Sequence, residues 1–216
     1  AAFVPSKLTA TQIKGRALDR EAAEEALPQS RKGKPLTRPE FIAEEKGLTP
    51  AQRGIALHLA MQYLPLEGDH SPEGIARELD RLTGEGFLTS LQREAIDPGK
   101  LAAFFESPIG REMRAAPNCR REFKFSLLVP AQDYYPGLEG EEILLQGVID
   151  AWFETAEGVT VLDFKTDRVR PGREREKAEE YRPQLEAYGR ALGQMLGRKV
   201  KRMVLWFFET DTAVEV

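Results

Sequence analysis

Two aspartates and a lysine, Asp150, Asp163 and Lys165, are the side chains of this 216-residue sequence whose spacing best fits catalytic chemistry. They belong to two apolar segments joined by a turn at residues 155–158, where a glycine supplies backbone freedom. Such a turn places Asp150 opposite Asp163, and Lys165 joins Asp163 on the same strand face. Facing carboxylates are unfavourable without a counter-charge, so the hairpin predicts a divalent cation site.

Several motifs occur in an order that resembles one nuclease family. Gly147-Val-Ile-Asp150 is followed by Asp163-Phe-Lys-Thr-Asp167 and by Gln184-Leu-Glu-Ala-Tyr188, and a helical segment containing His58 precedes them. The Asp-x-Lys element alone is short and degenerate, but the ordered set is specific. Over nearly the whole chain it resembles the RecB-like nucleases of the PD-(D/E)XK superfamily, and within them the AddA-type C-terminal nuclease domains.

The resemblance implies a metal-dependent phosphodiesterase site. It implies that Mg²⁺ or Mn²⁺ is held by His58, Asp150, Asp163 and the carbonyl of Phe164, and that Lys165 stabilises charge on the cleaved phosphate. Without the resemblance, the aspartates and the lysine fit ordinary ion pairs, and His58 fits an ordinary histidine on a helix stripe. The long apolar runs beside both aspartates favour the metal interpretation.

Three further residues gain roles from the same resemblance. Glu122, at the opening of a predicted strand, is similar to a family glutamate that helps to bind metal or to position Lys165, although a surface glutamate fits equally well. Gln184 and Tyr188 lie one helical turn apart on one face. The resemblance implies that they contact the DNA backbone and brace the active site, while Tyr188 also fits a core aromatic.

Two groups of basic residues are candidate phosphate contacts, and a solvated charged face is an equally good interpretation of each. The first comprises Arg111, Arg114, Arg120, Arg121 and Lys124, and the second comprises Arg168, Arg170, Arg173 and Arg175. The formal net charge of −4 argues against a basic domain that coats DNA. It remains compatible with a nuclease whose acidic metal site lies near a local basic patch.

Hydrophobic periodicity predicts an α/β fold with a mixed central sheet flanked by helices and an N-terminal helical region. Helices are predicted at 6–13 (capped by Ser6), 50–64 (capped by Thr49), 71–82, 89–96, 98–105 and 109–115. Strands are predicted from Arg121 onward and at 142–153, 159–164 and 203–208. A helix over 183–196 is predicted to begin at Pro183, which fits a first turn better than an interior.

Length and composition favour one soluble globular domain with 41% hydrophobic residues. We divide it into an N-terminal helix and linker region (1–47), a helical part (48–118) and an α/β catalytic core (119–216). The single cysteine, Cys119, excludes an intrachain disulfide and a four-cysteine iron–sulfur cluster. With no signal peptide or transmembrane run, it fits a cytoplasmic protein.

The expected function is Mg²⁺-dependent exonuclease action on DNA in double-strand-break processing and recombinational repair. The resemblance implies single strands delivered by a helicase motor and an AddB-like partner protein. The chain has no initial methionine and no phosphate-loop motif, so we expect a fragment of a longer helicase–nuclease. The alternatives are a free-standing RecB-like exonuclease and a non-catalytic DNA-binding or subunit-docking module. The latter predicts loss of Asp150, Asp163 or Lys165, and all three are present.

Overall fold

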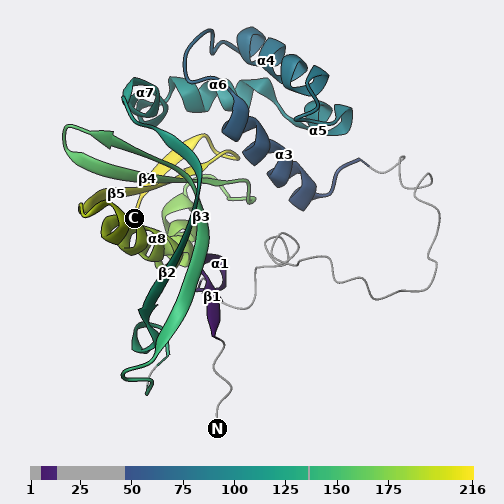
Figure 1. Ribbon diagram of the computed structural model, residues 1–216. Coiled ribbons are helices and arrows are strands. Elements are labelled where there is room, and N and C mark those ends of the chain that lie inside the picture. The colour runs from purple at the N-terminus through teal and green to yellow at the C-terminus, as the bar shows by residue number, and fades with distance from the viewer. Residues whose placement is uncertain (1–5, 14–46, 136) are drawn as a thin grey trace, which may run out of the picture.

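The computed structural model describes residues 6–13, 47–135 and 137–216 (Figure 1). The predicted linker therefore lies almost wholly outside the described residues. Within these ranges, no helix is both long enough and apolar enough to cross a membrane.

A mixed six-stranded sheet forms the centre of the molecule, as predicted. Its order is β1 (Lys7–Thr9), β3 (Glu142–Thr155), β4 (Gly158–Lys165), β5 (Val200–Phe207) and β6 (Thr212–Glu215), with β2 (Arg120–Pro130) pairing β3. The β1–β3 and β4–β5 pairs are parallel, and the other pairs are antiparallel. The short strands β1 and β6 were not predicted.

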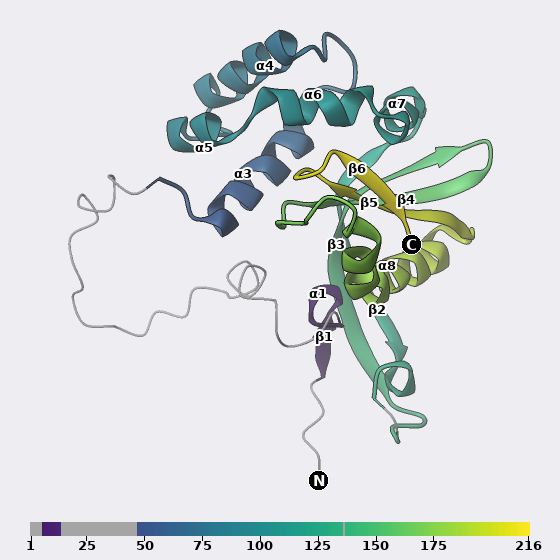
Figure 2. The same cartoon turned by 180° about the vertical axis from the view of Figure 1, so that it is seen from behind.

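Helices pack against the two faces of this sheet (Figures 1 and 2). One face carries α3 (Pro50–Tyr63), α4 (Pro72–Gly84), α5 (Ser90–Ala95), α6 (Pro98–Glu106) and α7 (Pro108–Ala115). The other face carries α8 (Glu174–Leu196). Strand β4 contacts helices on both faces of the sheet. Its Leu162 and Phe164 pack with the helices α3–α7, while Val159 and Val161 pack with α8. Asp163 lies in phase with the two valines and thus on the α8 side.

The predicted helix starts of the first layer are confirmed by their caps. The Thr49 hydroxyl accepts a hydrogen bond from the backbone N–H of Gln52, and the Gln52 side-chain oxygen accepts one from the backbone N–H of Thr49. Ser71 caps α4. These bonds satisfy backbone N–H groups that have no partner inside the helix. Such caps are readable from sequence because they depend on neighbouring residues alone.

Two predicted element boundaries were wrong. Helix α8 begins at Glu174, so Pro183 lies inside it, because burial of Ala178 and Tyr181 against the sheet outweighs the helix hydrogen bond that a proline cannot make. Residues 6–13 do not form one helix capped by Ser6. Pairing with β3 draws residues 7–9 into β1, and Thr9 caps the short helix α1 (Ala10–Ile13) with Gln12.

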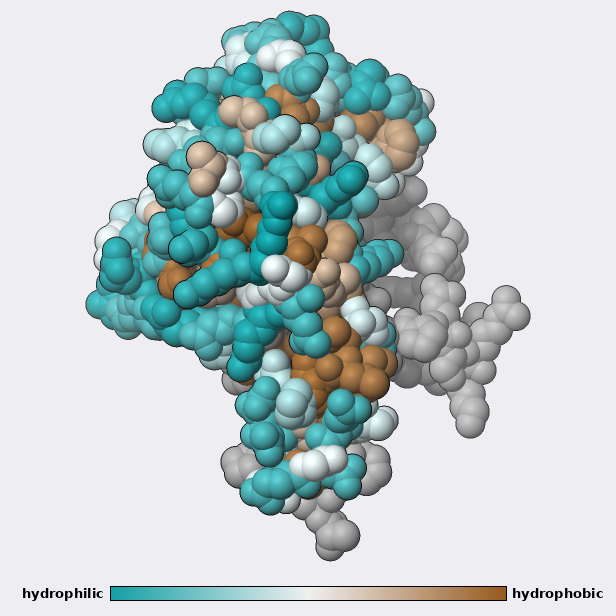
Figure 3. All heavy atoms as spheres, turned by 60° about the vertical axis from the view of Figure 1, so that its left-hand side comes forward, coloured by the Kyte–Doolittle hydropathy of each residue, from teal (hydrophilic) through white to brown (hydrophobic). Residues whose placement is uncertain are grey.

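The molecular surface is largely polar on the face shown in Figure 3, where hydrophobic residues gather in a band across the centre and in a second area below it. The interior combines aliphatic side chains with several buried aromatic rings. Phe104, Phe105, Phe153 and Phe207 are fully buried. This core fixes the strands that carry the candidate catalytic side chains.

Candidate active site

The hairpin of β3 and β4 brings the two candidate aspartates together. Ala151 pairs with Leu162, and continuing this antiparallel register by one residue sets Asp150 opposite Asp163, as predicted. Asp150 is also held from the neighbouring strand, because its Oδ2 accepts a hydrogen bond of 2.7 Å from the backbone N–H of Phe164. The carboxylate is therefore fixed in orientation by the hairpin itself.

His58 reaches the same place from α3. Its Nδ1 lies 3.4 Å from Asp150 Oδ1, and 33% of its side-chain surface is exposed. Close approach of the helix depends on Gly54, one turn earlier, because a Cβ there would meet Thr166 Oγ1 at 2.9 Å. A helix carrying a larger residue at position 54 would have to move away from the end of β4, and His58 would move with it.

Glu122 on β2 completes a group with the chemistry of a metal site. Its neighbours pair regularly with β3, but Glu122 itself has a φ of 51°, in the left-handed region that costs a residue other than glycine about 1–3 kcal/mol. His58, Glu122 and Asp150 each offer a ligand atom, and the three atoms lie within 4.8 Å of one another. One imidazole nitrogen and two carboxylate oxygens suit a divalent ion such as Mn²⁺ or Mg²⁺.

Asp163 is paired with Lys165 in this structure. It is 3% exposed, and its Oδ2 lies 2.6 Å from Lys165 Nζ, so it forms a buried ion pair and is not one of the three grouped ligands. Metal binding by Asp163 and by the carbonyl of Phe164 stays a prediction. The ion pair does place the lysine charge beside the aspartates, where a catalytic cation would act.

Gln184 and Tyr188 support Lys165 on the face of the sheet that α8 covers. Lys165 Nζ donates to Gln184 Oε1 at 3.3 Å, and Gln184 Nε2 donates to the Tyr188 hydroxyl at 2.9 Å. Both α8 side chains are buried, and Tyr188 packs edge-on against Phe125. Their bracing role thus has a geometric basis, while direct contact with DNA stays a prediction.

Tyr181 is a site residue that the sequence reasoning missed. Lys165 Nζ sits 4.1 Å from the centroid of its ring, and its hydroxyl donates to the carboxylate of Asp167. Lys177 Nζ is also within 4.0 Å of Asp167. Beginning the helix at Pro183 hid this role. The spacing of Tyr181 from Gln184 is the signal that could have revealed it, because residues three apart share a helix face.

Comparison with known families identifies this arrangement. Residues 29–215 match the model of the PD-(D/E)XK nuclease superfamily. The chain belongs to this superfamily. It is therefore a nuclease, and the family that the ordered motifs resemble is confirmed.

Curated relatives of this PD-(D/E)XK nuclease share one name, which describes each as the A-type subunit of an ATP-dependent helicase/nuclease. The protein of Desulforudis audaxviator (strain MP104C) is 41% identical over 212 residues, which cover 96% of this chain and 17% of the relative. That of Desulforamulus reducens is 37% identical over 215 residues, covering 98% and 17%. That of Thermoanaerobacter sp. (strain X514) is 35% identical over 219 residues, covering 100% and 18%. The chain thus spans less than a fifth of the length of these relatives.

The pKa values of three titratable side chains at the candidate site, His58, Asp150 and Asp163, are shifted in different directions. Burial lowers the pKa of His58, but the charge and hydrogen bond of Asp150, with help from Asp163, raise it to about 9. Burial raises the pKa of Asp150, yet His58, Lys165 and the N–H of Phe164 bring it below its ordinary value. For Asp163, burial and the charge of Asp150 raise the pKa despite Lys165. In the absence of metal, a proton on His58 is the counter-charge of Asp150.

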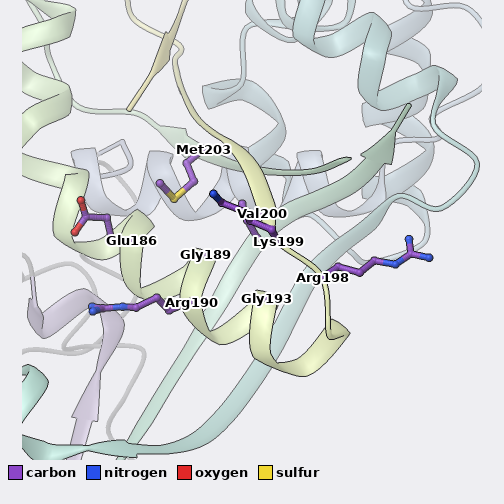
Figure 4. Close-up of a pocket in the computed structure, with 8 residues that line it drawn as sticks. All are labelled: Glu186, Gly189, Arg190, Gly193, Arg198, Lys199, Val200 and Met203. Carbon is purple, nitrogen blue, oxygen red and sulfur yellow. The ribbon is translucent and has the colours of Figure 1, made fainter. Parts of the chain in front are cut away.

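A hollow of about 470 Å³ lies elsewhere, between α8 and the start of β5 (Figure 4). Gly189 and Gly193 form part of its wall, and a Cβ at Gly189 would come within 2.9 Å of Met203 Sδ. In Figure 4 the side chains of Arg190 and Arg198 extend away from it in opposite directions. None of the three grouped ligands lines this hollow, so it lies apart from the candidate site.

Metal binding should release a proton from His58. A neutral imidazole is needed to bind a metal, whereas the raised pKa keeps His58 charged at pH 7 in the metal-free protein. We expect the apparent affinity for Mn²⁺ to rise with pH until about pH 9. Calorimetric titration at pH 7 in buffers of different ionisation enthalpy should show this release, and His58→Gln should lose it. An apparent enthalpy independent of buffer would contradict the expectation.

Asp163 should destabilise the metal-free fold. Because the pKa of Asp163 is raised in the folded protein, its ionisation favours the unfolded state. The fold should therefore lose stability as pH rises above 3.8, the ordinary pKa of the carboxyl group. Asp163→Asn should therefore leave the melting temperature at pH 7 unchanged or higher, while Lys165→Met, which removes the counter-charge, should lower it. Thermal unfolding in EDTA measures both. A marked fall for Asp163→Asn would show that the ion pair outweighs burial.

Proposed function

We propose that this domain is a Mg²⁺- or Mn²⁺-dependent deoxyribonuclease that hydrolyses DNA phosphodiesters as an exonuclease. The observation that carries the proposal is the meeting of His58, Glu122 and Asp150 with the Asp163–Lys165 ion pair, in a chain of the PD-(D/E)XK superfamily. The ligand group supports a divalent ion, and the adjacent ammonium supports charge stabilisation. We further propose that residues 48–118 and 119–216 act as the helical part and catalytic core of one nuclease domain.

Each residue then has a defined task. A divalent ion bound here would polarise the phosphate and acidify water. His58, Glu122 and Asp150 would hold the ion, with Asp163 and the Phe164 carbonyl as the further ligands that the family resemblance implies. Lys165 would stabilise the negative charge that develops on the cleaved phosphate and orient the attacking water.

The bracing residues determine where the Lys165 ammonium lies. Asp163, Gln184 and the ring of Tyr181 all contact it, which limits its rotamers before substrate arrives. Gln184 and Tyr188 act through this bracing, and contact with the DNA backbone is the additional role that the resemblance implies for them.

The biological setting is proposed from the relatives. Their printed name joins a helicase with a nuclease in a protein several times longer than this chain. We propose that the domain works within such a chain, in the cytoplasm, on single strands that a helicase motor delivers. An AddB-like partner protein would complete the enzyme, and its task would be processing of double-strand breaks for recombinational repair.

Cleavage should require both a divalent metal and Lys165, but loss of Lys165 should lower kcat without lowering the affinity for metal. The protein should cut single-stranded DNA with Mg²⁺ or Mn²⁺ and stop in EDTA. Lys165→Met should lower kcat by about a hundredfold or more, because the lysine acts on the transition state. Its affinity for Mn²⁺ should stay close to that of the wild type. Loss of metal binding in parallel with turnover would give Lys165 a structural role instead.

Tyr181 should act through the face of its ring. Tyr181→Phe keeps the ring under Lys165 and should retain turnover, whereas Tyr181→Leu should lower kcat by roughly thirtyfold, because a desolvated cation–π contact contributes about 2 kcal/mol. Single-turnover kinetics with Mn²⁺ affinity and melting temperature measured in parallel would separate positioning from instability. If Tyr181→Phe and Tyr181→Leu both fold and have equal kcat, the ring of Tyr181 does not position Lys165.

A further inference from the structure

The two basic groups noted in the sequence are no longer equivalent once their contacts are known. Arg121 is half-buried and donates to two carbonyls at the C-terminal end of α3, at 2.6 and 2.7 Å. Arg111 and Arg114 both face Glu106 at 3.6 Å. Three of the five cations in the first group therefore already have partners in the protein, Arg111 through an exposed ion pair, which argues against a track for DNA there.

The second group lies on the loop that joins β4 to α8, directly after Lys165. The side chains of Arg168 and Arg170 are exposed and have no hydrogen bond or ion pair to any part of the chain that the structure describes. The nearest acid in sequence, Asp167, already binds the Tyr181 hydroxyl and faces Lys177. Two arginine charges thus remain available beside the site in a protein whose net charge is −4.

The loop that carries these arginines is held in one shape. Val169, between them, is only 7% exposed and packs in a cluster with Tyr181 and Leu185. After it, the N–H of Arg173 donates to the carbonyl of Arg170 at 2.9 Å, and Gly172 has a φ of 87°, as in a type II turn with proline in second place. A fixed loop presents its charges at lower entropic cost than a flexible one.

We propose that Arg168 and Arg170 bind backbone phosphates of the DNA strand next to the phosphodiester that is cleaved. This inference rests on the proposed function. Arg168 follows Lys165 by three residues, a backbone distance of at most about 11 Å, and its own side chain adds reach. Guanidinium groups hold phosphate oxygens with two parallel hydrogen bonds and keep their charge. Contacts of this kind fix the register of the strand without reading its sequence.

Binding of a fluorescent oligothymidylate tests the proposal, measured by anisotropy against KCl concentration in EDTA, in the Asp163→Asn background. Replacing Arg168 and Arg170 together by Gln should weaken binding several-fold and lower the salt slope by about 1.4, which is roughly 0.7 for each lost phosphate contact. Replacing Arg111 and Arg120 by Gln removes equal charge from the other basic group and should change neither quantity appreciably. Equal effects of the two double variants, or a larger effect of the second, would overturn the proposal.

Cleavage kinetics separate this inference from the proposed function. With Asp163 intact and Mn²⁺ present, the Arg168/Arg170 double variant should show a raised KM for DNA and a kcat close to that of the wild type. A wild-type protein that cuts no DNA would count against the proposed function. A wild type that cuts normally, with an unchanged KM in the double variant, would count against the arginine contact alone.

Discussion

The repulsion between Asp150 and Asp163 is the constraint on which the rest of the site depends. The register of an apolar hairpin forces the two carboxylates to face each other, and neither strand can slip without exposing its core side chains. The surrounding structure offsets this repulsion with positive charge and hydrogen-bond donors. His58 and the backbone N–H of Phe164 contact Asp150, and Lys165 forms an ion pair with Asp163. These groups offset the negative potential of the two carboxylates, and the same potential would attract a divalent ion.

Both helical layers are needed to supply those groups. On one side, α3 carries His58, and Arg121 ties the end of that helix to β2, which also carries Glu122. On the other side, α8 carries Gln184 and Tyr181 against Lys165. A change of packing in either layer would therefore alter the site without touching an aspartate.

The sequence predicts those features that local rules determine. Register of the hairpin, the Thr49 cap and the phase of His58 on its helix all follow from residues within a few positions of one another. Other features depend on distant packing. Burial of Tyr181 carries α8 past Pro183, and pairing on both sides of Glu122 holds it in a left-handed conformation. Likewise, nothing in the spacing of Arg121 distinguishes a helix-capping arginine from one that meets phosphate.

The most direct test of the account is a crystal of the protein soaked in Mn²⁺, with the ion located by its anomalous scattering. The account predicts one strong peak about 2 Å from ligand atoms of His58, Glu122 and Asp150, with Asp163 either joining them or remaining paired with Lys165. A strong peak at another acidic cluster, with Asp150 still paired with His58 and Asp163 with Lys165 and no ion between them, would contradict it.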